Sequence, residues 1–202
     1  MLKRVFLGGL LALALSSTAF AANPAKQIAV FAGGCFWSVQ KAMDHMPGIL
    51  ATRAGFMGGK VKNPTYEEVT EHGTGHLEAV EVTFDPTKVS YSQLMDAFWH
   101  HTDPTNPDGV ICDYGPNYHT AIFTFSDAQF AAANASKAAV AKELGKPIVT
   151  QIIKASETPL PFYPAEDYHQ HYWKTHTIAY DSYALGCGRS QALHRLWGKL
   201  AD

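Results

Sequence analysis

The sequence lacks the features that mark several common classes of protein. It has only three cysteines in 202 residues, and their spacings match no zinc-binding pattern such as C-x-x-C. Acidic and basic side chains nearly balance, with a formal net charge of −2, so charge favours neither nucleic acid nor an anionic membrane surface as a partner. The G-x-x-x-x-G-K-[ST] pattern of a phosphate-binding loop is also absent. Any chemistry must therefore come from a small number of individual side chains.

Long apolar runs are also scarce, and the one that stands out is at the N-terminus. Lys3-Arg4 precede an apolar run over residues 5–15, and Ala-Phe-Ala at 19–21 is a small-x-small sequence. This pattern predicts a signal peptide over residues 1–21, cleaved after Ala21, although an uncleaved anchor is an alternative. The run is too short to span a bilayer unaided. We therefore expect an exported protein, periplasmic or secreted, with one domain over residues 22–202 and no membrane association after cleavage.

Hydrophobic periodicity and turn signals predict alternating strands and helices. The expected strands cover residues 27–31, 49–56, 77–84, 120–125 and 148–154, and the main expected helices cover residues 36–45, 65–71, 90–100, 126–144 and 191–200. This order indicates an α/β two-layer sandwich with a mixed sheet, followed by a long C-terminal loop region.

Cys35 occupies an unusual place in the stretch AVFAGGCFWSVQ, directly after two glycines. A predicted strand ends there and a predicted helix begins, so free N–H groups and the helix dipole would stabilise a thiolate. The alternative is a small core residue at a tight turn, because free cysteine is usually buried. An odd number of cysteines in an oxidising compartment leaves at least one thiol free or in transient use, and this favours a reactive Cys35.

Glu78 lies in the predicted strand LEAVEVTF, where alternation puts it on the same face as Val80, Val82 and Phe84. A carboxyl on an apolar face has a raised pKa and can donate a proton near neutral pH. If the register is wrong by one residue, Glu78 faces solvent instead.

These residues leave three functional classes open. Thiol redox chemistry would use Cys35 with a second thiol from the C-terminal segment. A cysteine hydrolase would use Cys35 with His169 or His119 as the base. A non-catalytic domain would use the aromatic side chains as a peptide groove. The histidines lack acidic or cysteine partners at ligand spacing, so we expect neither a metal nor another cofactor.

Four motifs distinguish among these classes. GGCFW at 33–37, NPTYEEV at 63–69, GHLEAVEVTFDP at 75–86 and AEDYHQHY at 165–172 occur in this order. Together they resemble the A-type peptide-methionine sulfoxide reductases, from about Gln27 to the C-terminus. The resemblance implies a ferredoxin-like α/β core that reduces methionine S-sulfoxide, free or in oxidised proteins, with a thioredoxin-like reductant. We expect a monomer.

The resemblance also implies roles for individual residues. Cys35 resembles the nucleophile that attacks the sulfoxide sulfur and becomes a sulfenic acid. Glu78 resembles the acid that protonates the sulfoxide oxygen. Phe36 and Trp37 resemble the aromatic walls of the pocket that holds the substrate methyl group.

Tyr66 and Tyr118 resemble hydroxyls directed at the sulfoxide oxygen, and Asp113 resembles a carboxylate of the polar network. The loop before the fourth predicted strand, which carries Asp113 and Tyr118, departs from the family pattern. Many members read D-x-G-x-Q-Y-R-S, whereas this chain reads DYGPNYHT from Asp113. Asp113 and Tyr118 keep their spacing, but Asn117 and His119 differ and put the surrounding hydrogen bonds in doubt.

We predict different roles for the two remaining cysteines, Cys187 and Cys112. Cys187 lies between two glycines and resembles the family's recycling cysteine. We expect turnover to generate a Cys35–Cys187 disulfide, because glycines permit the necessary backbone excursions. Cys112 precedes Asp113, whose charge should disfavour a Cys112 thiolate if the two lie close. The expectation is therefore that Cys112 is dispensable.

Overall fold

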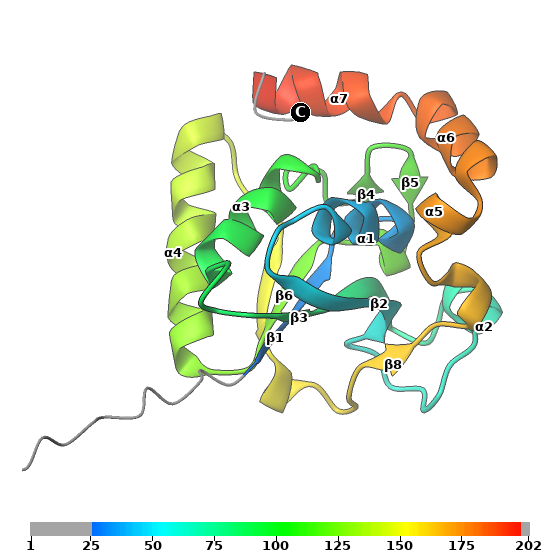
Figure 1. Ribbon diagram of the computed structural model, residues 1–202, viewed down its shortest axis with the longest axis horizontal. Helices are drawn as coiled ribbons and strands as arrows, with labels where there is room; N and C mark the ends of the chain where they lie inside the picture. Colours follow the sequence, from blue (N-terminus) through cyan, green and yellow to red (C-terminus); the bar gives the residue numbers. More distant parts are fainter. Residues whose placement is uncertain (1–25, 199–202) are drawn as a thin grey trace, which may run out of the picture.

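The computed structural model describes residues 26–198 (Figure 1), so the predicted signal peptide lies outside the described residues. The first part of the chain has the order β-α-β-β-α-β, interrupted by a short helix, a hairpin and a 3-10 turn. Its main elements are β1 (Gln27–Ala32), α1 (Phe36–Asp44), β2 (Ile49–Met57), β3 (Leu77–Phe84), α3 (Tyr91–His100) and β6 (Ala121–Thr124). The interrupting elements are α2 (Tyr66–Thr70), β4 (Gly109–Val110), β5 (Asp113–Tyr114) and the 3-10 turn Pro116–Tyr118.

The six-stranded sheet has the order β7-β6-β1-β3-β2-β8, in which β7 (Gln151–Lys154) and β8 (Tyr163–Pro164) are the edges. The β6–β7 pair is parallel, and the other neighbours are antiparallel. The central strands β6-β1-β3-β2, with helices α1 and α3 packed against them, form a ferredoxin-like arrangement (Figure 1). The prediction of an α/β fold with a mixed sheet and a ferredoxin-like core is confirmed.

The central strand β3 is buried on both faces. Val80, Val82 and Phe84 belong to the main core with residues of α1, α3 and α4 (Asp127–Leu144). Leu77 and Ala79 belong to a second cluster on the opposite face. Both faces of the strand near Glu78 are therefore removed from water, which a simple alternating pattern does not predict.

The C-terminal region is more helical than the sequence indicated. It contains α5 (Tyr172–Thr175), α6 (Thr177–Gly186) and α7 (Arg189–Trp197), of which α6 was not predicted. Only Tyr180 is buried on α6, so this helix has almost no apolar stripe from which to recognise it. Cys187 follows α6 directly and lies at the joint between two helices, not in a long loop.

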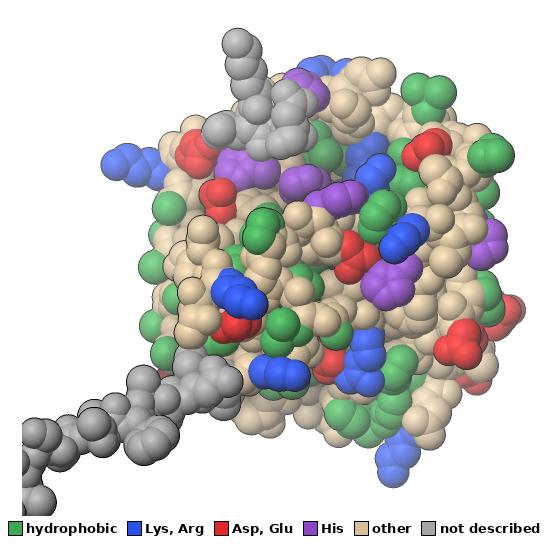
Figure 2. All heavy atoms as spheres, in the orientation of Figure 1, with side chains coloured by type: hydrophobic (Ala, Val, Ile, Leu, Met, Phe, Trp, Pro, Cys, Tyr) green, Lys and Arg blue, Asp and Glu red, His purple; other side chains and the backbone are tan. Residues whose placement is uncertain are grey.

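The surface in view carries charges of both signs. Figure 2 shows Lys and Arg side chains interspersed with Asp and Glu on the face that carries α3 and α4. This face therefore has no large region of a single sign, in line with the balanced composition. Within residues 26–198, no helix has both the length and the apolar character needed to cross a membrane.

Candidate active site

The two glycines before Cys35 have a packing role. Gly34 adopts φ +80°, and a Cβ on it would lie 2.6 Å from the Cβ of Val110 in the β4–β5 hairpin. Only glycine accommodates both the positive φ and this close approach. The hairpin can therefore lie directly against the turn that precedes α1, where Cys35 is the N-cap residue.

Glu78 is brought to the same helix start. It is 1% exposed, and its Oε2 accepts a hydrogen bond of 3.0 Å from the backbone N–H of Phe36. Burial raises the pKa of Glu78 to about 8, although the Phe36 hydrogen bond acts in the opposite direction. Glu78 Oε1 has no hydrogen-bond partner among residues 26–198. At neutral pH this carboxyl is mostly protonated, as required of a proton donor.

The Cys35 thiol is not the exposed thiolate that its position suggested. Cys35 carries a free thiol and is 6% exposed. Burial raises the pKa of this thiol, and the nearby carboxyls of Glu78 and Asp113 raise it further. At the helix start the Trp37 N–H acts on the Cys35 sulfur and lowers its pKa, whereas Phe36 N–H binds Glu78 and Cys35 N–H is directed at Asp113. The helix start therefore favours a thiolate as predicted, but burial and the two carboxyls outweigh this effect and Cys35 stays a thiol in this state of the protein.

Two tyrosines and Asp113 complete the polar side of the site. Burial raises the pKa of Tyr66 to about 12 and also raises that of Tyr118, and Glu78 adds to both shifts. Both hydroxyls therefore keep their protons at neutral pH and can donate hydrogen bonds. Asp113 lies on β5, where burial raises the pKa of its carboxyl. The structure thus brings Tyr66, Tyr118 and Asp113 into one electrostatic environment with Cys35 and Glu78.

The predicted aromatic walls are also assembled. The ring centroids of Phe36 and Tyr66 are 6.1 Å apart, and those of Phe36 and His169 are 5.1 Å apart. Trp37 stacks on Tyr172 at 4.0 Å with an interplanar angle of 12°. This aromatic surface joins the first helix to the AEDYHQHY segment.

His169 takes part in this wall in a way that bears on the hydrolase alternative. Its Nδ1 accepts a hydrogen bond of 3.1 Å from Trp37 Nε1. An indole N–H only donates, so Nδ1 is unprotonated and a neutral His169 carries its proton on Nε2. Burial lowers the pKa of His169, so the neutral form prevails. Neither ring nitrogen is then free to accept a proton from a thiol, and the hydrolase loses its buried candidate base.

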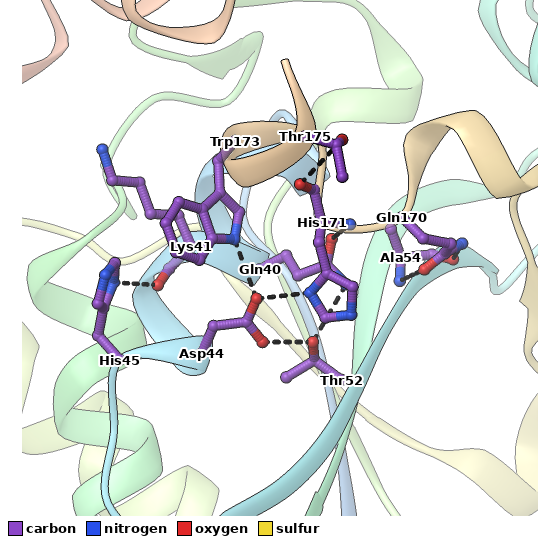
Figure 3. A network of polar contacts seen from close by, with 10 residues as sticks. All are labelled: Gln40, Lys41, Asp44, His45, Thr52, Ala54, Gln170, His171, Trp173 and Thr175. Carbon is purple, nitrogen blue, oxygen red and sulfur yellow. Dashed lines mark hydrogen bonds and ion pairs between the residues drawn. The ribbon is translucent and has the colours of Figure 1, made fainter. Parts of the chain in front are cut away.

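A polar network fastens the AEDYHQHY segment to the core (Figure 3). Asp44, the last residue of α1, accepts hydrogen bonds from His171 Nδ1 at 2.7 Å and Trp173 Nε1 at 2.9 Å. The Gln170 amide pairs with both the N–H and the carbonyl of Ala54, each at 2.9 Å. Gln170 therefore continues the hydrogen bonding of β2 with its side chain. The network fixes the residues that flank His169 and so supports the aromatic wall.

The disulfide differs from the one expected. Cys187 is bonded to Cys112, with the Cα atoms 5.3 Å apart, and not to Cys35. The expectation that Cys112 stands apart from the disulfide chemistry is therefore corrected. Cys112 is exposed at the turn of the β4–β5 hairpin, and the next residue, Asp113, lies 3.9 Å from Arg189 Nη1. This positive charge offsets the Asp113 carboxylate and holds the hairpin close to the α6–α7 joint.

Among residues 26–198, a group of potential metal ligands is found at this disulfide. Donor atoms of Cys112, Asp113 and Cys187 lie within 4.8 Å of one another. Both sulfurs are bonded to each other and are not available as thiolate ligands.

Sequence reasoning missed Tyr183. Its hydroxyl donates a hydrogen bond of 2.8 Å to Asp113 Oδ2, and it lies close enough to the Cys35 thiol to lower its pKa. Its ring meets Trp37 edge-on with the centroids 6.0 Å apart. Tyr183 lies one helical turn before Cys187, so recognition of α6 would have drawn attention to it.

Comparison with known proteins identifies the family. The family model described as peptide methionine sulfoxide reductase matches residues 27–201. The peptide methionine sulfoxide reductase MsrA of Bacillus licheniformis is 45% identical over 183 residues, which cover 88% of this chain and 97% of that protein. The structure of methionine sulfoxide reductase A of Corynebacterium diphtheriae has a TM-score of 0.74 and 32% identity over 77% of each chain. Mxr1 from Saccharomyces cerevisiae in complex with Trx2 has the same fold, with a TM-score of 0.52 and 22% identity, covering 77% of this chain and 91% of that one.

This agreement extends over nearly all of the described chain and includes the segments that carry Cys35, Glu78 and Cys187. The chain therefore belongs to the peptide methionine sulfoxide reductase family, and it reduces methionine sulfoxide to methionine.

Proposed function

We propose that the protein reduces the S epimer of methionine sulfoxide with Cys35 as the nucleophile and Glu78 as the proton donor. The observation that carries this proposal is the buried Glu78 carboxyl beside Cys35, with a pKa of about 8 and one oxygen without a partner among the described residues. That oxygen is available to a sulfoxide oxygen. Tyr66 and Tyr118 add hydroxyl donors, and Phe36 and Trp37 offer aromatic faces to the sulfur-bound methyl group.

The first step transfers the sulfoxide oxygen to sulfur of the enzyme. The Cys35 sulfur attacks the sulfoxide sulfur while Glu78 protonates the sulfoxide oxygen, which weakens the S–O bond. The proton that the Cys35 thiol gives up restores Glu78 to its protonated form. Methionine leaves, and Cys35 becomes a sulfenic acid. The substrate sulfur gains two electrons and Cys35 loses two, so no metal or other cofactor is required.

The second stage returns Cys35 to a thiol through two exchanges. The Cys187 thiol attacks the sulfenic acid and releases water, which gives a Cys35–Cys187 disulfide. The Cys112 thiolate then attacks the Cys187 sulfur and releases Cys35, which gives the observed Cys112–Cys187 disulfide. Because Cys112 is exposed whereas Cys35 is buried, the relay moves the oxidising equivalents to a surface where a protein dithiol can attack.

The proposed reductant is a thioredoxin-like protein, as in the complex of yeast Mxr1 with Trx2. The N-terminal sequence pattern supports export of this chain, so we propose that the reductant is located in the periplasm or outside the cell. We further propose that the working form is a monomer, since every group named in the reaction comes from one chain.

The function is tested by incubating the pure protein with each sulfoxide epimer and dithiothreitol. We expect consumption of the S epimer alone. Consumption of the R epimer, or of neither, would refute the assignment.

The relay is tested with Cys112→Ser, and Ser92→Ala, an exposed change on α3, is the control. In Cys112→Ser the first equivalent of methionine should form at the wild-type rate, while thioredoxin-driven turnover should fall by about tenfold or more. Full thioredoxin-driven turnover by Cys112→Ser would remove Cys112 from the pathway.

A further inference from the structure

Helix α6 lies beside the active site and is held at few points. Of its residues only Tyr180 is buried, where its hydroxyl donates a hydrogen bond of 3.2 Å to Ser38 on α1. A cavity of about 690 Å³ separates α6 and α7 from α1 and α3, and its α6 wall includes Ala184 and Leu185. A helix with so little buried apolar surface belongs to the least stable part of a fold. α6 can therefore move without disturbing the sheet.

Tyr183 is the residue of α6 that reaches the reacting groups. Its hydroxyl binds Asp113 at 2.8 Å and interacts with the Cys35 thiol, and its ring meets Trp37. These three partners are the nucleophile, a polar contact and a wall of the proposed substrate pocket. With Tyr183 in this position Cys35 is 6% exposed, which leaves little access for a methionine sulfoxide side chain.

The disulfide fixes Tyr183 in this position. Cys187 follows α6 directly, and Cys112 directly precedes Asp113, the hydrogen-bond partner of Tyr183. One covalent bond therefore ties the C-terminal end of α6 to the strand that carries Asp113. Gly188 adopts φ +63° at the start of α7, and this glycine joint can absorb a rotation of α6 once the bond is broken.

We propose that Tyr183 is a gating residue, which closes the substrate pocket while the Cys112–Cys187 disulfide is intact and leaves it when that disulfide is reduced. This inference rests on the proposed function. A closed pocket in the disulfide form also protects Cys35 from oxidation. In the disulfide form Cys35 is a thiol but both resolving thiols are consumed, so a second sulfoxide would leave an unresolved sulfenic acid open to further oxidation. The gate prevents a second reaction until a dithiol has supplied two electrons and two protons to the disulfide.

The test measures alkylation of Cys35 by iodoacetamide, with the modified Cys35 peptide quantified by mass spectrometry. The full chain is compared with its disulfide intact and after reduction and anaerobic removal of dithiothreitol. Cys35 should react at least about tenfold more slowly in the disulfide form. Equal rates in the two forms would overturn the proposal.

Variants separate the gate from general burial. In the disulfide form, Tyr183→Ala should raise the Cys35 alkylation rate by about tenfold, and Tyr183→Phe, which keeps the ring, by a smaller factor of about threefold. Ile178→Ala, an exposed change on the same helix, should leave the rate unchanged. Wild-type rates in both tyrosine variants would refute the gating role, and the Tyr183→Phe result decides if Tyr183→Ala does not fold.

A second measurement ties the gate to turnover. The wild-type disulfide form, without reductant, should yield almost no methionine from methionine sulfoxide, whereas Tyr183→Ala should yield up to one equivalent and a Cys35 sulfenic acid that dimedone traps. Equal yields from the two proteins would contradict the gate. If no protein yields methionine even after reduction, the proposed function fails, and the alkylation rates still decide the gate independently.

Discussion

Replacing Glu78 by Gln should abolish most activity and at the same time stabilise the protein at neutral and alkaline pH. Gln has nearly the same shape, and its carbonyl can still accept the Phe36 N–H bond. It cannot transfer a proton to the sulfoxide oxygen. The first-turnover rate should therefore fall by about 10² to 10⁴, the usual range for loss of a positioned acid, with a smaller effect on substrate binding.

The stability effect follows from the raised pKa of Glu78. The pKa increases from 4.5 in the reference state to about 8 in the folded protein, and each unit corresponds to about 1.4 kcal/mol. Below pH 4.5 both states carry the proton and Glu78 has no effect. Between pH 4.5 and 8 only the folded state carries it, so wild-type stability falls by about 1.4 kcal/mol per pH unit. Above pH 8 the loss levels off at about 5 kcal/mol, an upper bound that the variant avoids.

The assay makes one measurement on the disulfide form of each protein and another on its reduced form. Urea unfolding of the disulfide form at pH 5, 6.5 and 8 gives the free energy of unfolding, and the difference between variant and wild type should grow with pH. Rapid-quench measurement of methionine from the reduced form gives the chemical step. Parallel stability curves would show that Glu78 is not buried as a neutral acid. An unchanged first-turnover rate would show that it is not the proton donor.

Three further predictions address the nucleophile, the turn and the N-terminus. Cys35→Ser should abolish methionine formation, because a hydroxyl cannot replace the thiol as nucleophile, and substantial residual activity would exclude Cys35. Gly34→Ala should lower the free energy of unfolding by about 2 kcal/mol or more, because of its positive φ and the clash with Val110. The control Gly145→Ala, at φ +60° with open space around it, should lower it by only about 1 kcal/mol. Equal losses in urea titrations of the two variants would contradict the clash. Exported material should begin at Ala22, which N-terminal sequencing checks, and an intact Met1 would overturn the proposed localisation.

The sequence by itself determined the elements whose signals are local. The capping box at the start of α3, the end of α4 at Gly145 and the alternation in β3 all depend on residues close in sequence. Ser90 caps α3 and Ser126 caps α4 as their spacing indicates, because each hydroxyl needs only a backbone N–H three residues away. Alternation along the strand, which backbone geometry fixes, places Glu78 on the same face as Val80 and Val82, although both faces of β3 are buried around it.

The four motifs determined more, since they identified the family and with it Cys35 and Glu78. They did not determine the protonation state of either group. The helix start suggested a thiolate, and the Trp37 N–H there does lower the pKa of Cys35, but two other N–H groups bind carboxyls and burial outweighs the effect. The pKa of a group depends on what surrounds it in three dimensions, and no local pattern contains that information.

Only the tertiary structure decided the disulfide and the position of Tyr183. Cys112 and Cys187 are 75 residues apart in sequence, and they meet because Asp113 and Arg189 bring a short hairpin to the joint between two helices. Helix α6 has almost no apolar stripe, so periodicity does not reveal it, and without α6 nothing places Tyr183 beside Asp113 and Trp37. These contacts depend on how distant segments pack, whereas sequence patterns record what each segment does with its own neighbours.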